Sequence, residues 1–209
     1  MAVYIAVIIA ALGAAIYGIG GLPLGPFYSI AVLLSGLVFF FVFLLLAYRL
    51  VLAIRPLKSG VLEAGSAQET TYLIYSLFIL MGFGSLMRSG MIPIPALPPL
   101  YKALGAKIGR NTCIAGMIAV PPLVKIGEDC HIGHGAVLSP HAADEVPPSI
   151  QPITIGDHVT IGIYSVILQD VEIGNHAVIN SNSTVSEGTR IGDNEIWGGS
   201  PAIFIKKRA

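Results

Sequence analysis

The chain has 209 residues and a formal net charge of zero; 11% of its residues are charged and 54% are hydrophobic. About a quarter of the residues in an ordinary soluble domain are charged, so the composition argues against that class. It also excludes a disordered chain, which needs low hydrophobicity and high charge. There is no basic surplus to hold a polyanion, and we expect no nucleic-acid partner. Two cysteines, Cys113 and Cys130, cannot build a disulfide framework, which favours a reduced, cytosol-facing environment.

The first 58 residues predict a transmembrane helical hairpin. Residues 2–19 form an uncharged apolar run of about the length that spans a bilayer, and a Gly- and Pro-rich segment at 20–26 breaks it. A second run over 27–48 is long enough to cross back, and it ends in aromatic and basic residues, namely Tyr48, Arg49, Arg55 and Lys58. A signal peptide would need a basic n-region and a small-residue cleavage site, and neither stands out.

The positions of the charges predict the orientation in the membrane. The loop between the two runs has no charge, whereas basic residues follow the second run, so the positive-inside rule places both chain ends in the cytoplasm. A third apolar stretch, 71–87, is interrupted by Gly82 and Gly84 and followed by Arg88. Within a connector over 59–104 it is predicted as an interfacial or re-entrant helix. We therefore expect a multi-pass inner- or plasma-membrane protein whose remaining domain, 105–209, faces the cytoplasm.

That remaining domain contains an internal repeat of six residues. Every sixth residue is aliphatic: Ile108, Ile114, Val120, Ile126, Ile132 and Leu138, then Ile155, Ile161, Ile167, Ile173, Ile179, Val185 and Ile191. Gly often follows the aliphatic residue, and six residues leave room for little more than a short strand and a turn. Three such units make one triangular coil, and an 18-residue period is present as well. The pattern predicts a mainly β solenoid with the aliphatic residues inside.

This pattern resembles the left-handed β-helix of hexapeptide-repeat acyltransferases over about residues 105–203. Three local stretches sharpen the resemblance. The lead-in segment, 97–108, is similar to that of the membrane-anchored branch, which includes acyltransferase-like terminal domains of some nonribosomal peptide synthetases. Leu138-Ser139-Pro140-His141, a loop and then Pro152-Ile153-Thr154-Ile155-Gly156 resemble the catalytic region of sugar O-acetyltransferases. Gly198-Gly199-Ser200-Pro201-Ala202 and a basic tail resemble the end of the family's fold.

A break in the period also draws attention to His141. The interval from Leu138 to Ile155 is not a multiple of six, so the chain must leave the coil there, and such loops tend to lie on a functional face. A histidine near Asp144 or Glu145 can be held in one tautomer and used as a general base. The alternative is that His141 caps a turn while the two carboxylates are solvated loop charges.

The resemblance implies an acyl-CoA co-substrate, most simply acetyl-CoA, and direct transfer with His141 as the base. It implies an oxyanion donor at the backbone N–H of Ile163, and coenzyme A contacts at Ile163, Ser181, Ser200, Lys206 and Lys207. Two positions that are often basic in the family are Glu187 and Ile203 here. His131 and His134 precede the loop by less than one coil and could line the same cleft.

The resemblance further implies a homotrimer with the active site between neighbouring copies. A membrane anchor favours a membrane-associated acceptor, such as a lipid-linked sugar or an envelope glycan. Two alternatives stay open: a zinc-dependent β-helix enzyme similar to carbonic anhydrases, and a non-catalytic trimeric scaffold. The histidine spacings do not match that zinc site and the cysteines form no CxxC pair, so we expect no metal.

Overall fold

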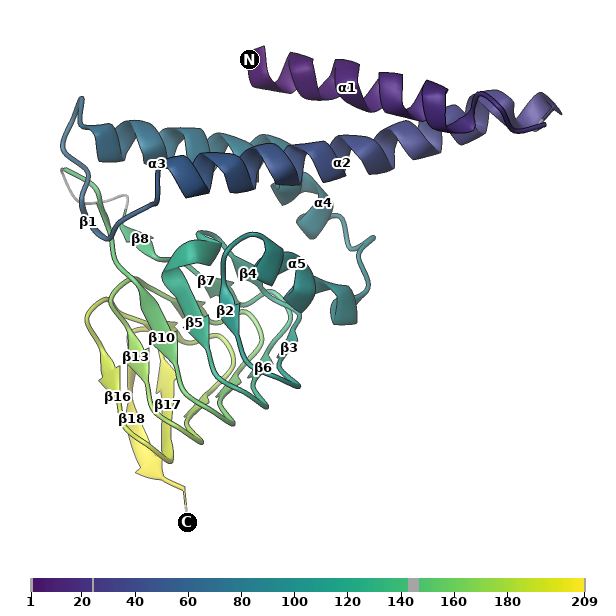
Figure 1. Ribbon diagram of the computed structural model, residues 1–209. Coiled ribbons are helices and arrows are strands. Elements are labelled where there is room, and N and C mark those ends of the chain that lie inside the picture. Colours follow the sequence, from purple (N-terminus) through teal and green to yellow (C-terminus); the bar gives the residue numbers. More distant parts are fainter. Residues whose placement is uncertain (1, 24, 143–146, 209) are drawn as a thin grey trace. The chain divides into compact units, whose positions relative to one another are not determined.

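The structure is a computed structural model that describes residues 2–23, 25–142 and 147–208 (Figure 1). The chain forms two compact units, Met1–Pro56 and Leu57–Ala209. The predicted domain limits at residues 58 and 104 stay predictions.

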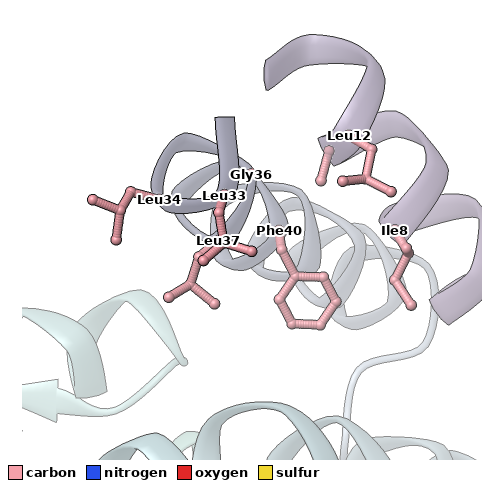
Figure 2. Close-up of a pocket in the computed structure, with 8 residues that line it drawn as sticks. Ile8, Leu12, Leu33, Leu34, Gly36, Leu37 and Phe40 are labelled. Carbon is pink, nitrogen blue, oxygen red and sulfur yellow. The ribbon is translucent and has the colours of Figure 1, made fainter. Parts of the chain in front are cut away.

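The first unit is a helical hairpin. Helix α1 (Ala2–Ile19) and helix α2 (Tyr28–Ile54) are joined by a turn in which the Leu22 N–H donates to the Ile19 carbonyl at 2.9 Å, and by the 3-10 helix η1 (Gly25–Phe27). The helices approach closely at Gly36, where a Cβ atom would lie 3.8 Å from the Ala15 and Leu12 side chains. An apolar groove of about 380 Å³ lies between them (Figure 2). The most apolar 18-residue window of the helical stretch Gly25–Ile54 has a mean hydropathy of 3.0, and the stretch is long and apolar enough to cross a membrane.

The second unit opens with a helical segment of three parts. Helix α3 (Ala67–Leu77) continues through the π-helix η2 (Phe78–Phe83) into helix α4 (Gly84–Arg88). Ser66 Oγ accepts the Glu69 N–H at 3.0 Å, and Glu69 Oε2 accepts the Gly65 N–H at 2.6 Å, so that free backbone donors at the helix start are satisfied. The π turn ends at Gly84, where a Cβ atom would lie only 2.8 Å from the Ile79 carbonyl oxygen. Residues 67–88 also pass the test of length and composition for a membrane span.

The rest of the second unit is a parallel β-helix with three sheets, the arrangement expected of the predicted left-handed β-helix (Figure 1). The first sheet contains β2 (Lys107–Ile108), β5 (Val124–Ile126), β10 (Ile153–Ile155), β13 (Glu172–Ile173) and β16 (Arg190–Ile191). The second contains β3 (Cys113–Ile114), β6 (His131–Ile132), β11 (Thr160–Ile161), β14 (Val178–Ile179), β17 (Glu195–Gly199) and β18 (Ala202–Lys207). The third contains β4 (Met117–Ile118), β7 (Val137–Leu138), β12 (Val166–Ile167) and β15 (Thr184–Val185). All thirteen aliphatic residues of the six-residue repeat are buried, which confirms the predicted solenoid interior.

The first coil departs from the strict repeat. The six-residue step places Val120 in the ladder, but the residue that pairs with Leu138 is Ile118 in β4. Val120 is buried at the start of the 3-10 helix η4 (Pro121–Leu123) instead. The physical reason is the pair of prolines, which have no N–H to donate to a ladder and fit a turn better.

The corners between the first and second sheets have left-handed backbone conformations. Five residues occupy them with φ between +54° and +60°: Asn111, Asp129, His158, His176 and Asn194. Asn, Asp and His are the non-glycine residues that adopt this region most readily. The rings of His158 and His176, which lie on successive corners, stack with their centroids 4.7 Å apart and 5° between their planes.

Both ends of the solenoid are covered. At the start, helix α5 (Leu97–Ala103) places Leu97 and Tyr101 in the β-helix core, and the Tyr101 hydroxyl donates to the Gly116 carbonyl and accepts the Ile118 N–H, both at 3.2 Å. At the other end, β18 turns back and pairs antiparallel with β17 (Figure 1).

Ile161→Ala should destabilise the full chain by about 2–5 kcal/mol, because the side chain is 1% exposed and its removal leaves a cavity. Ile163→Ala is the matched control: its side chain is 47% exposed, and a change within about 0.5 kcal/mol is expected. Chemical denaturation of the purified protein, followed by circular dichroism, measures both. Equal losses for the two variants would contradict the assignment of the solenoid interior.

Candidate active site

The chain leaves the coil after Leu138, as the break in the repeat predicts, and forms a small antiparallel sheet. Strand β8 (His141–Ala142) pairs with β9 (Ser149–Ile150), which pairs with β1 (Gly60–Val61). The Leu62 N–H donates to the Pro148 carbonyl at 2.8 Å. Residues 60–62, which follow the helical hairpin, therefore hold in place the segment that leaves the coil after Leu138. We call this segment the excursion. The sequence pattern gave no sign of β1, because two residues are too few to show a period.

His141 is half-buried on β8 and its ring is oriented by Ser139. Ser139 Oγ lies 3.3 Å from His141 Nδ1 and donates to the His141 carbonyl oxygen at the same distance. A hydroxyl has one proton to give. With that proton directed at the carbonyl, Ser139 Oγ accepts a hydrogen bond from Nδ1–H, and the lone pair of the imidazole is then on Nε2. This is the tautomer that a general base requires.

Two further features surround the His141 ring. Tyr72 of α3 lies beside it, with a distance of 6.5 Å between the ring centroids. Burial lowers the pKa of the His141 imidazole below its ordinary value of 6.5, because desolvation penalises the charged form. His141 is therefore neutral, and able to accept a proton, at physiological pH. The predicted partners Asp144 and Glu145 lie outside the described residues. Ser139 orients the ring from within the described chain.

A buried glutamine ties the excursion to the coil beneath it. Gln169 Nε2 donates to Ser149 Oγ on β9 at 2.6 Å and to Glu187 Oε2 at 3.2 Å. The Gln169 side chain is 4% exposed, and its Oε1 atom has no hydrogen-bond partner among the described residues. Glu187, at a position where the resemblance leads one to expect a basic residue, thus accepts a hydrogen bond within the fold. Sequence reasoning missed Gln169, since a lone glutamine in a repeat carries no signal.

The predicted oxyanion donor and one predicted coenzyme A contact are stacked on the corner between the second and third sheets. Ile163 and Ser181 lie one coil apart, and the Asn182 N–H donates to the Ile163 carbonyl at 2.9 Å. The amides on either side of Ile163 are paired, Gly162 with Ile179 and Tyr164 with His134. The Ile163 N–H itself has no acceptor among the described residues, so it is available to an oxyanion.

The other predicted contacts lie at the C-terminal end of the solenoid. Ser200, in the turn between β17 and β18, donates from its hydroxyl to Thr184 Oγ1 at 3.0 Å. Lys206 and Lys207 are exposed on β18, opposite Ile196 and Glu195. Ile163, Ser181 and Ser200 thus follow one corner down the solenoid, whereas the two lysines lie at the far end of β18, next to the corner between the first and second sheets.

His141 and the Ile163 corner are on different corners of the same chain. His141 belongs to the corner between the third and first sheets, whereas Ile163 precedes β12 at the other end of the third sheet. Between the two corners the chain passes through β12, and the extended residues 165–168 alone advance it by roughly 10 Å. A base and an oxyanion donor that far apart cannot act on one carbonyl group. The two halves meet only if the His141 corner of one copy faces the Ile163 corner of another.

The remaining histidines of this region are also placed. His131 faces outward on the second sheet, in register with Cys113. His134 is exposed on the corner that carries Ile163, and its ring makes an edge contact with Tyr164 at 5.8 Å. In one chain neither is beside His141. Among residues 2–23, 25–142 and 147–208 no group of three or more His, Cys, Asp or Glu side chains is placed to hold a metal ion.

Comparisons with known proteins agree with this fold. The family model of bacterial transferase hexapeptide (six repeats) matches residues 152–187. A hexapeptide-repeat-containing acetyltransferase of Vibrio cholerae O1 biovar eltor, solved with acetyl coenzyme A, is 20% identical with a TM-score of 0.55; the match covers 74% of this chain and 97% of that one. A galactoside acetyltransferase in complex with coenzyme A is 20% identical with a TM-score of 0.53, and 71% and 86% are covered. No curated protein matches the sequence. These likenesses show a shared fold.

The half-buried position of His141 predicts how it titrates. In the folded chain its pKa lies below 6.5, so between that pKa and 6.5 the unfolded chain binds the extra proton more readily. The contribution of His141 to stability is therefore complete above pH 6.5 and falls as the pH falls toward the folded pKa. Hydrogen–deuterium exchange at the His141 ring carbon, followed by mass spectrometry, should give a midpoint below 6.5 in the folded protein. In denaturant the midpoint should return to about 6.5. A folded midpoint at or above 6.5 would contradict the burial of the ring.

Proposed function

We propose that this protein is an acetyltransferase of the hexapeptide-repeat type, which transfers an acyl group from acyl-CoA to a hydroxyl or amine of a membrane-associated acceptor. The observation that carries the proposal is a neutral, half-buried His141, oriented by Ser139, in an excursion from a β-helix. The shared fold supports it, since both compared proteins are acetyltransferases solved with coenzyme A or its acetyl ester.

The proposed reaction is a direct transfer. His141 Nε2 takes the proton of the acceptor O–H or N–H, and the acceptor atom forms a bond to the thioester carbonyl carbon. The negative charge on the carbonyl oxygen is stabilised by the Ile163 N–H of a neighbouring copy, a kind of contact worth about 3–4 kcal/mol. The carbon–sulfur bond then breaks and coenzyme A leaves as a thiolate. The imidazolium of His141 gives its proton to this thiolate, which restores the neutral base. No covalent enzyme intermediate is needed.

Coenzyme A is proposed to follow the corner from Ile163 past Ser181 and Ser200 toward the lysines of β18. The exposed Ser181 side chain offers a hydrogen bond to the pantetheine arm, one coil from the Ile163 N–H that is assigned to the thioester carbonyl. Lys206 and Lys207 offer positive charge to the nucleotide phosphates, with Glu195 opposite Lys207 reducing the net charge there.

The membrane anchor belongs to the proposal as well. The helical stretch Gly25–Ile54 is buried over only 11% of its most apolar window, and a surface that apolar is unfavourable in water. We place the hairpin in an inner or plasma membrane with the β-helix in the cytoplasm. Labelling of single cysteines introduced near residue 22 and at residue 208, with a membrane-impermeant reagent on intact cells, tests this orientation.

His141→Ala should reduce transfer of labelled acetyl groups from acetyl-CoA to a membrane extract by about 10²–10⁴-fold, because a general base contributes that much. The matched control is His158→Asn, at a solenoid corner whose left-handed backbone Asn also adopts; its activity should stay near that of the unmodified protein. Undiminished transfer by folded His141→Ala protein would overturn the catalytic role.

The placement of the two halves on different corners predicts complementation between copies. His141→Ala removes the base, and Ser181→Trp fills the Ile163 corner, so each variant alone should be inactive. Coexpressed with different affinity tags and purified through both, they should recover roughly a third of the activity, because every mixed trimer contains one intact site among its three. Absence of recovery in a mixed assembly would show that the site does not lie between copies.

Size and mass measurements in mild detergent should give a homotrimer.

A further inference from the structure

The second unit contains a cavity of about 580 Å³ that the proposed reaction does not use. We name it the corner pocket; the segment Met87–Leu97 forms one wall, and the turns Ala115–Met117 and His134–Val137 form the other. Its volume is in the range of small-molecule sites, about 300–1,000 Å³.

The walls of the corner pocket are mostly hydrocarbon. Met87 and Ile92 pack against the β-helix core from the helical side, and Met117 and Val137 are register partners on β4 and β7. Tyr101 contributes a polar atom, but its hydroxyl is already engaged with the Gly116 carbonyl and the Ile118 N–H. This part of the pocket therefore favours an alkyl chain over a polar group.

The lining of the corner pocket also includes one positively charged side chain, Arg88. Arg88, the last residue of α4, is exposed and forms no ion pair with a described residue. The two arginines within the β-helix behave differently: Arg110 pairs with Glu128, and Arg190 pairs with Asp170 and Glu172. A free guanidinium beside an apolar cavity is complementary to an anionic head group on an alkyl chain, and phosphate matches its fork of donors.

The corner pocket also lies on the corner that carries Ile163. His134 lines the pocket, and its ring contacts Tyr164, the residue after Ile163. The pocket is therefore separated by one ring contact from the residue next to Ile163, whose amide the proposed reaction assigns to the oxyanion. Arg88 ends the helical segment that is apolar enough to contact a membrane.

We propose that the corner pocket binds the lipid phosphate of the acceptor, with the alkyl chain against Met87, Ile92 and Val137 and the phosphate on Arg88. The inference rests on the proposed function, because it names the class of acceptor: a lipid phosphate or pyrophosphate that carries the group to be acylated. A long acyl chain on coenzyme A has related chemistry, and the experiment separates the two sources.

The test is photolabelling of the full-length protein in phosphatidylcholine nanodiscs with dodecyl phosphate that carries a diazirine at the chain end. Peptides that contain residues 87–97 and 115–117 should be labelled. Arg88→Gln should weaken labelling about 10-fold or more through loss of a charge-assisted hydrogen bond, and Val137→Phe should abolish it by filling the cavity. The controls are Arg110→Gln and Val166→Phe, the latter on the next strand in register with Val137 and outside the pocket; both should label normally.

Competitors and a catalytic variant give the remaining outcomes. Unlabelled dodecyl phosphate should compete, whereas dodecanol and inorganic phosphate should not. Competition by dodecanoyl-CoA as strong as that by dodecyl phosphate would assign the pocket to the acyl donor and overturn the proposal. Labelling that neither pocket variant reduces would also overturn it. His141→Ala should label normally, because the base is not part of the pocket. Labelling of the unmodified protein without any acetyl transfer from acetyl-CoA would refute the proposed function and leave the binding site standing.

Discussion

The fold depends on the hydrogen bonds between successive coils of the β-helix. Most strands have only two or three residues, so none is stable alone, and each becomes a strand because its neighbour 18 residues away offers matching donors and acceptors. The aliphatic residue of each unit fills the interior, and a left-handed corner residue turns the chain. On the corner between the second and third sheets, the Ile163 N–H has no acceptor among the described residues, and such an amide is what the β-helix can offer to a ligand.

The same constraint explains why the reactive groups lie where the repeat fails. A coil that keeps its period has no room for a side chain such as His141 to be held from several directions. Once the chain leaves the coil, β9 and β1 can support His141 from the side, and Gln169 can fasten the excursion from below. The half-buried surroundings that lower the pKa of His141 are thus a product of the interruption. The regular coils fix where the excursion lies, and the excursion contains the proposed general base.

The sequence predicted the solenoid well because its signal is repeated thirteen times and every instance reports the same contact. The helical hairpin and the departure from the coil after Leu138 were predicted equally well. Uncharged runs and a broken period can be recognised in the sequence without knowing which other residues they contact. The role of Ser139, the strand Gly60–Val61 and the Gln169 bridge were not predicted. Each depends on a contact between residues that are distant in sequence or on the rotamer of one side chain. Such contacts produce no repeating pattern in the sequence. Asp144 and Glu145 stay predicted partners of His141, since they lie outside the described residues, and Ser139 makes the described contact to the ring.

The covered ends of the β-helix limit how copies of this chain can associate. A solenoid with open edges can add further coils end to end and grow into a fibre. Here β18 occupies the last edge of the second sheet, the Ser200 turn bonds to Thr184 at the last edge of the third, and Arg190 holds two carboxylates at the last strand of the first. Helix α5 closes the opposite end with Tyr101. The covered ends oppose growth along the axis, so the sides of the prism are the surfaces on which the proposed association of copies would close.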